Sequence, residues 1–179
     1  MRLALVCHPD TPCAAVTRIE VEVARAGQGA LALTYALTGA IGDLAIPPPA
    51  APDRTDELWR RTCFEAFVRP GAGEAYFEVN LSPSTQWAAY RFSGYRDGMA
   101  GAEIAAPRIE VRRADDRLEL RAHLALPQSA DAPWALGLSA VIEEASGRKS
   151  YWALAHPPGR PDFHHAASFA AQLAAPAAK

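Results

Sequence analysis

Residues 58–95 contain side chains that could bind a small molecule or act as an acid–base pair. Glu65 and Glu78 supply two carboxylates, Asn80 an amide and Arg91 a guanidinium. Groups of these types hydrogen-bond the hydroxyls of sugars. Two carboxylates at a defined separation are also what a glycosidase requires. The alternative is a polar sheet surface with cross-strand ion pairs, and the residue types alone leave the choice open.

Aromatic side chains accompany these polar groups. Trp59, Trp87 and Tyr90 fall in the same stretch, and Tyr151 and Trp152 follow later. An indole ring can stack on the C–H face of a sugar while neighbouring polar groups bond its hydroxyls. Aromatic residues also build protein cores, and for Trp87 and Tyr90 we favour the core.

Three segments with a two-residue alternation must position the polar side chains. They cover residues 62–69, 75–81 and 86–93 and are separated by proline, glycine and serine, which is typical of short β-strands joined by turns.

The alternation assigns the side chains to two faces, because successive side chains of a strand point in opposite directions. If the three strands are neighbours, Glu65, Glu78 and Asn80 share one face. The opposite face carries apolar core candidates: Phe64, Ala66, Val68, Phe77, Val79 and Leu81. In the third segment either set could face the core, so the side on which Arg91 lies stays open.

The remaining sequence has the same character. Short alternating runs are separated by turn residues throughout, and the proline-rich residues 39–57 predict a long surface connection. We predict an all-β fold with one domain spanning residues 1–179, a single antiparallel β-sandwich of roughly nine to eleven strands.

Charge and composition exclude several classes of function. The net charge is −2, and no basic stripe of the kind that binds nucleic acid is present. No apolar run approaches the roughly 20 residues of a membrane span. The apolar run at residues 3–7 is shorter than the core of a signal peptide, so we expect a cytoplasmic protein with reduced cysteines. The oligomeric state is not indicated by the sequence.

Three histidines lie in the proline-rich segment from His156 to His165. A metal-dependent hydrolase could use them, but their spacing matches no standard zinc site. We favour a structural role in which Phe163 packs this loop onto the sheet and the imidazoles hydrogen-bond the backbone.

Three stretches together resemble the DOMON-like superfamily, and within it a bacterial group related to family 9 carbohydrate-binding modules. They are LWRRTCFEAFV (58–68), YFEVNLSPSTQWAAYRF (76–92) and PDFHH (161–165). The resemblance implies a β-sandwich that binds a small ligand, either a sugar or, in other branches, haem.

Family 9 modules hold a terminal sugar between two tryptophans, with a glutamate six residues after the first and an arginine further on. Trp59 and Glu65 match that spacing, Arg91 is a counterpart of the arginine, and Trp152, or Tyr151 in its place, is a counterpart of the second tryptophan. With Asn80 from the same predicted face, these residues form the expected site. We expect a non-catalytic carbohydrate-binding module without cofactor.

The haem alternative would need axial ligands. In the DOMON branch these are often methionine and histidine, and here Met99 could pair with His123, His156, His164 or His165. No spacing in the sequence supports haem specifically.

Overall fold

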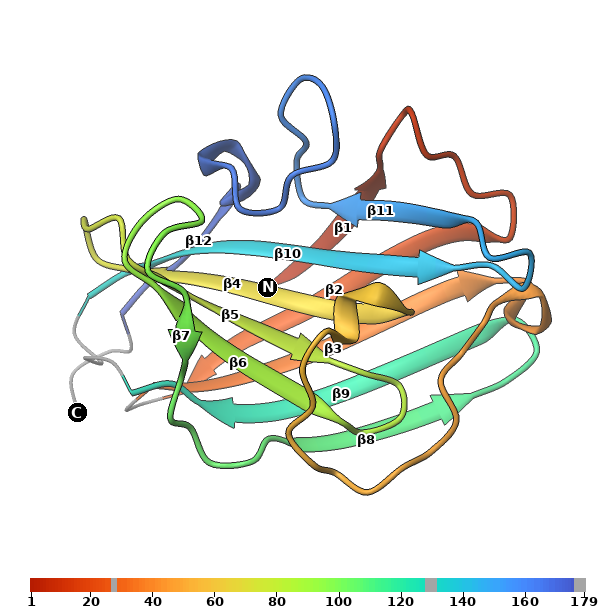
Figure 1. The fold of residues 1–179 in the computed structure, drawn as a ribbon, viewed down its shortest axis with the longest axis horizontal. Helices are drawn as coiled ribbons and strands as arrows, with labels where there is room; N and C mark the ends of the chain where they lie inside the picture. Colours follow the sequence, from red (N-terminus) through yellow and green to blue (C-terminus); the bar gives the residue numbers. More distant parts are fainter. Residues whose placement is uncertain (27–28, 128–131, 176–179) are drawn as a thin grey trace.

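The computed structural model of the protein describes residues 1–26, 29–127 and 132–175, and within them the chain forms twelve β-strands (Figure 1). The strands are β1 (Arg2–Cys7), β2 (Val16–Ala26), β3 (Ala30–Gly39), β4 (Cys63–Pro70), β5 (Tyr76–Leu81), β6 (Trp87–Phe92), β7 (Ala100–Gly101), β8 (Arg108–Arg113), β9 (Arg117–Ala125), β10 (Trp134–Glu143), β11 (Lys149–Ala153) and β12 (Ala171–Leu173). Three short 3₁₀ segments are η1 (Ile41–Asp43), η2 (Leu58–Arg60) and η3 (Ala166–Ser168). No helix among these residues is long and apolar enough to cross a bilayer.

The strands follow one hydrogen-bonded path in the order β7-β6-β5-β4-β10-β11-β1-β2-β3-β9-β8, and β12 also pairs with β10. Every pairing along this path is antiparallel, which confirms the predicted all-β antiparallel architecture. The strand count is one above the predicted range. A sandwich of two separate sheets is not confirmed, because β1 joins the two halves: Leu5 pairs with Ile19 of β2, and Val6 pairs with Ala153 of β11.

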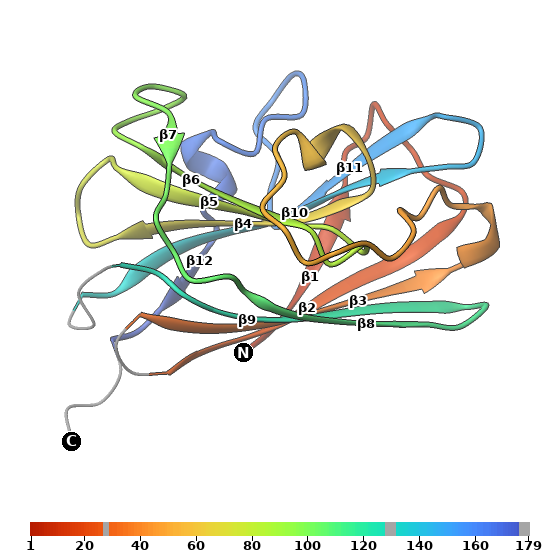
Figure 2. The same cartoon turned by 60° about the horizontal axis from the view of Figure 1, so that its bottom comes forward.

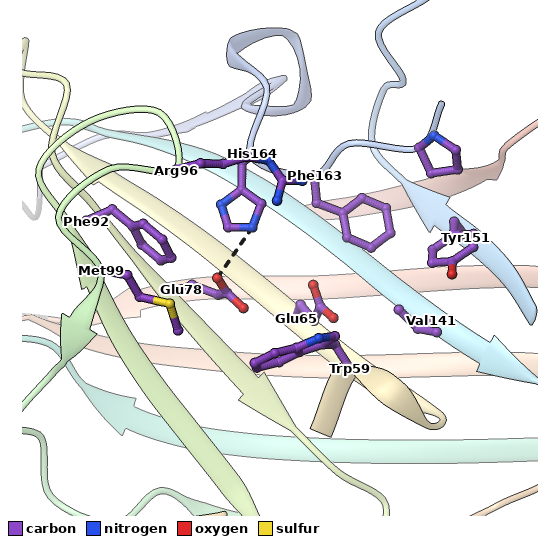
Figure 3. Close-up of a pocket in the computed structure, with 11 residues that line it drawn as sticks. Trp59, Glu65, Glu78, Phe92, Arg96, Met99, Val141, Tyr151, Phe163 and His164 are labelled. Carbon is purple, nitrogen blue, oxygen red and sulfur yellow. Dashed lines mark ion pairs between the residues drawn. The ribbon is translucent and has the colours of Figure 1, made fainter. Parts of the chain in front are cut away.

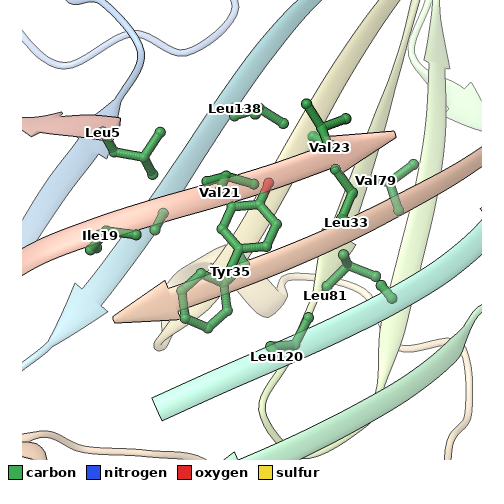
Figure 4. Close-up of a cluster of buried hydrophobic side chains, with 14 of the residues drawn as sticks. Leu5, Ile19, Val21, Val23, Leu33, Tyr35, Val79, Leu81, Leu120 and Leu138 are labelled. Carbon is green, nitrogen blue, oxygen red and sulfur yellow. The ribbon is translucent and has the colours of Figure 1, made fainter. Parts of the chain in front are cut away.

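The main core lies between the two halves of this curled sheet (Figures 2 and 4). The predicted alternation is confirmed, since the inward positions of β4 and β5 are all buried there: Phe64, Ala66, Val68, Phe77, Val79 and Leu81. Tyr35 of β3 is fully buried and its hydroxyl donates to the backbone oxygen of Glu65, 2.7 Å away. This bond ties one half of the sheet to the other directly beneath the polar face.

A second, smaller cluster covers the outer face of the half formed by β4, β5, β6 and β10. Phe67, Tyr90 and Phe163 belong to it, so the segment after β11 packs on the sheet through Phe163 as predicted. Gly137 of β10 permits this approach, because a Cβ atom there would lie 3.1 Å from the carbonyl oxygen of Ser168 and 3.3 Å from the Cβ of Phe67. The segment that contains Phe163 and η3 therefore covers the outer face as a roof, which makes an enclosed site possible.

Candidate ligand-binding site

A cavity of about 360 Å³ lies between this outer face and its roof (Figure 3). Glu65 of β4, Glu78 of β5 and Val141 of β10 form its floor, and Phe163 and His164 come from the roof. The two carboxyl groups reach the same cavity because Phe67 pairs with Glu78 and Glu65 with Asn80, which puts alternate residues of both strands on one face. The predicted meeting of two carboxylates on one sheet face is confirmed.

Aromatic rings form much of the remaining wall. Trp59, Phe92 and Tyr151 line the cavity together with Phe163. Trp59 is partly exposed and packs edge-on against Tyr90, with ring centroids 5.9 Å apart. It is presented by η2, a single turn that follows the proline-rich connection. A ligand in the cavity would thus meet apolar ring surface and carboxyl groups together.

Glu65 is buried under conditions that disfavour its charge. It is 3% exposed, and its Oε2 accepts one long hydrogen bond of 3.4 Å from Ser139. Burial, reinforced by the neighbouring charge of Glu78, raises the pKa of Glu65 well above its usual value, and the Ser139 bond opposes this only in part. Its Oε1 has no hydrogen-bond partner among the described residues.

Glu78 is held between Asn80 and His164. Asn80 donates to Oε1 of Glu78 at 2.8 Å, and Nε2 of His164 lies 3.7 Å from Oε2. Burial raises the pKa of Glu78, although the Asn80 bond and the charge of Arg96 oppose the rise. Burial and the repulsion of Arg96 lower the pKa of His164 to about 4, against the attraction of Asp162. The imidazole is therefore neutral at neutral pH, so its contact with Glu78 is not an ion pair.

Arg96 enters the cavity from the loop after β6. Its guanidinium bonds the carboxylate of Asp162 in the roof at 2.9 Å, and the hydroxyl of Tyr95 bonds the other oxygen of that carboxylate. Burial favours the neutral acid, but these bonds prevail and hold the pKa of Asp162 below its usual value. The loop and the roof are thus connected across the cavity mouth.

Two residues beside the cavity have left-handed backbone. Glu57, two residues before Trp59, has φ 62°, and Arg96 has φ 53°. Only one other non-glycine residue of the described chain, Thr85, has a positive φ. Such conformations cost of order 1 kcal/mol each and concentrate at functional sites. Arg96 itself lines the cavity, and Glu57 directly precedes η2, the turn that carries Trp59.

The predicted site residues are only partly brought together. Trp59 and Glu65 line the cavity, and Asn80 lies beneath it, bonded to Glu78. Arg91 is exposed and has the same parity as the inward-facing Trp87, so it lies on the opposite side of β6. Trp152 is 6% exposed and packs in the main core.

Two other residues line the cavity: Tyr151, directly before Trp152, and Arg96, five residues after Arg91. Tyr151, which the sequence left as an alternative to Trp152, points to the outer face because it pairs with Val141, whereas Trp152 pairs with the inward Ala140. Arg96, a loop residue, was missed because a side chain in an irregular loop follows no parity. Its only sequence signal was the turn punctuation of Gly94 and Gly98 around it.

No three His, Cys, Asp or Glu side chains in residues 1–26, 29–127 and 132–175 are grouped to hold a metal ion. His156 contacts the backbone oxygen of Val6 at 2.8 Å, away from His164. Met99 and His164, two of the residues considered as haem ligands, both line the cavity, and Nδ1 of His164 lies 2.7 Å from the hydroxyl oxygen of Tyr76.

The likeness to one solved structure supports the fold. The structure is similar to that of a candidate carbohydrate-binding protein from Bacteroides uniformis, with a TM-score of 0.65 and 14% sequence identity, over 94% of this chain and 83% of the other. Two structures of a family 9 carbohydrate-binding module from Caldicellulosiruptor kristjanssonii, in complex with cellotriose and with glucose, give TM-scores of 0.49 and 0.47 at 12% and 11% identity. They cover 79% of this chain and 67% and 69% of theirs. No protein-family model and no curated protein matches the sequence.

At these identities the likeness establishes the fold and no more. The resemblance to the DOMON-like superfamily remains a prediction, and so do the ligand and the residues that contact it.

Proposed function

We propose that the protein binds a small carbohydrate, without transforming it, in the cavity between the outer sheet face and its roof. The observation that carries this proposal is the combination of aromatic walls with two buried carboxyl groups on one floor. Trp59 and Tyr151 would pack against the C–H faces of the ring, and Glu65, Glu78 and Arg96 would bond its hydroxyls.

The size of the cavity supports a small ligand. Ligand pockets in proteins measure about 300–1,000 Å³, and 360 Å³ lies at the lower end of that range. A monosaccharide, or the terminal unit of a longer chain, suits such a space. The Bacteroides uniformis protein, whose structure is similar, is itself a candidate for carbohydrate binding, which supports the same ligand class here.

Tryptophan fluorescence tests the proposal directly. Of the four tryptophans, all within the described residues, Trp87, Trp134 and Trp152 are buried and Trp59 is partly exposed. Titration with a panel of mono- and disaccharides should change the emission in a saturable way. Trp59→Ala should abolish that change while leaving thermal stability nearly intact. A large loss of stability would instead make Trp59 a core residue, and a flat response across the panel would contradict carbohydrate binding.

Two arginines provide a matched pair of variants. Arg96→Ala removes a cavity side chain, and Arg91→Ala removes an exposed one from the opposite side of β6. Calorimetric titration should show weaker binding for Arg96→Ala and unchanged binding for Arg91→Ala. The reverse order would place the ligand on the other face of the sheet.

A further inference from the structure

The floor of the cavity has more free hydrogen-bond acceptors than donors. Oε1 of Glu65 is buried and has no partner among the described residues. Oε2 of Glu78 has Nε2 of His164 at 3.7 Å, which is beyond hydrogen-bond range. The side-chain amide of Asn80 already donates to Glu78. A buried acceptor without a donor costs free energy, so a ligand that brings donors to this floor would be favoured.

The charges around the cavity do not neutralise the two carboxyl groups. Arg96 is the cation that lines it, and its guanidinium is bonded to Asp162. His164 is neutral near pH 7, because its pKa is lowered to about 4. If Glu65 and Glu78 were both ionised, the floor would carry two negative charges with little compensation. The raised pKa of Glu65 reflects this repulsion as well as burial.

The aromatic walls are suited to a cation as well as to a sugar ring. The faces of Trp, Tyr and Phe rings attract ammonium groups, most strongly when water is excluded. Trp59, Phe92, Tyr151 and Phe163 surround the same space into which the carboxyl group of Glu65 points (Figure 3). Unpaired carboxyl oxygens enclosed by aromatic rings favour a positively charged ligand with an apolar surface.

We infer that the ligand carries an ammonium group and is an amino sugar with a free amine, its nitrogen seated between Glu65 and Glu78 and its ring against Trp59. This inference rests on the proposed function and narrows it from carbohydrates in general to cationic ones. The three N–H bonds of the ammonium supply donors to Oε1 of Glu65 and Oε2 of Glu78. The sugar hydroxyls remain for Arg96 and solvent.

Isothermal titration calorimetry at neutral pH with glucose, D-glucosamine and N-acetyl-D-glucosamine tests the inference. The three sugars share the glucose ring, and only glucosamine carries a cationic amine. Charge-assisted hydrogen bonds predict that glucosamine binds at least about tenfold more tightly than the other two. Equal affinities, or preference for a neutral sugar, would overturn the inference and leave the proposed function standing. Absence of binding by all three would overturn both.

Cyclohexylammonium separates the cation from the sugar. It has a ring and an ammonium group but no hydroxyls, so it should bind more weakly than glucosamine. If it binds as tightly as glucosamine while glucose does not bind, the cationic site stands and carbohydrate binding is overturned.

Isosteric variants locate the preference. Glu65→Gln and Glu78→Gln keep the shape of the side chain but cannot hold a negative charge beside the ammonium group. Each should lower the ratio of glucosamine affinity to glucose affinity toward one. Glu22→Gln, an exposed site on β2 in the other half of the sheet, is the control and should keep the wild-type ratio. An unchanged ratio in both cavity variants would overturn the inference.

Discussion

The hydroxyl oxygen of Tyr76 lies 2.7 Å from Nδ1 of His164. The same oxygen accepts a hydrogen bond from the backbone N–H of Arg96 at 3.3 Å. We predict that the phenol donates to Nδ1, which makes His164 an Nε2–H tautomer whose proton faces Glu78. This chain of contacts connects the loop after β6, strand β5 and the roof of the cavity.

The first prediction concerns that tautomer. Tyr76→Phe removes the hydroxyl but keeps the ring, which stacks on Phe92 with centroids 4.7 Å apart. The free energy of unfolding should fall by about 1 kcal/mol, because one hydrogen bond is lost. Long-range ¹H–¹⁵N spectra should show a pure Nε2–H tautomer for His164 in the wild type and a mixture in the variant. A wild-type spectrum dominated by the Nδ1–H form would contradict the chain of contacts.

Acid should weaken the fold through His164. Its pKa is about 4 in the folded protein against 6.5 in an unperturbed histidine, owing to burial and the repulsion of Arg96. Between these values the unfolded chain takes up a proton that the folded protein does not. The contribution of His164 to the free energy of unfolding therefore falls as the pH drops from 6.5 to about 4, by about 1.4 kcal/mol per pH unit. Urea unfolding of the wild type and of His164→Gln across this range measures this contribution as the difference between their slopes.

Glu65 should have the opposite effect at higher pH. Its folded pKa lies above the unperturbed 4.5, so above pH 4.5 the unfolded chain releases a proton that the folded protein keeps. Stability consequently falls as the pH rises toward the folded pKa, again by about 1.4 kcal/mol per unit. Glu65→Gln should flatten this dependence and be more stable than the wild type at pH 8. Comparison of each variant with the wild type separates the two opposing slopes.

Gly137 should be required for the roof. A valine there places carbon atoms against the carbonyl oxygen of Ser168 and the side chain of Phe67, and overpacking of this kind costs about 1–3 kcal/mol. Gly42→Val is the matched control, because a Cβ atom there has no neighbour within 4 Å. The melting temperature of Gly137→Val should be well below that of Gly42→Val. The quenching of Trp59 fluorescence by acrylamide should increase only in Gly137→Val. Equal melting temperatures would show that the roof can shift at no cost.

The parity of strand residues could be read from the sequence wherever apolar and polar side chains alternate. In β4 Glu65 is the one polar residue in an otherwise apolar run from Cys63 to Val68, so its outward position was predictable. In β6 both parities carry apolar residues, and the inward parity of Arg91 became clear only from its pairing with Phe77 and the burial of Trp87. A strand buried on both sides has no polar face to mark its orientation.

The loops set the limit of prediction for the site. Tyr151 and Trp152 are adjacent and both aromatic, so one residue of register decides which ring enters the core. Arg96 reaches the cavity from a turn whose path depends on contacts with Asp162, 66 residues later. Such long-range contacts leave no periodic pattern in the sequence, whereas the two carboxyl groups on paired strands do.

The double pairing of β1 also determines when the fold can close. Val6 and Cys7 find their partners in Ala153 and Trp152, near the other end of the chain, while Leu5 pairs with the nearby Ile19. A ribosome makes β1 well before β11, so a growing chain can complete β1–β2–β3 while the end of β1 that pairs with β11 stays unpaired. Unpaired strand edges are sites of association between chains. The chain thus passes through a stage in which this edge of β1 is exposed, until β11 has been made and pairs with it.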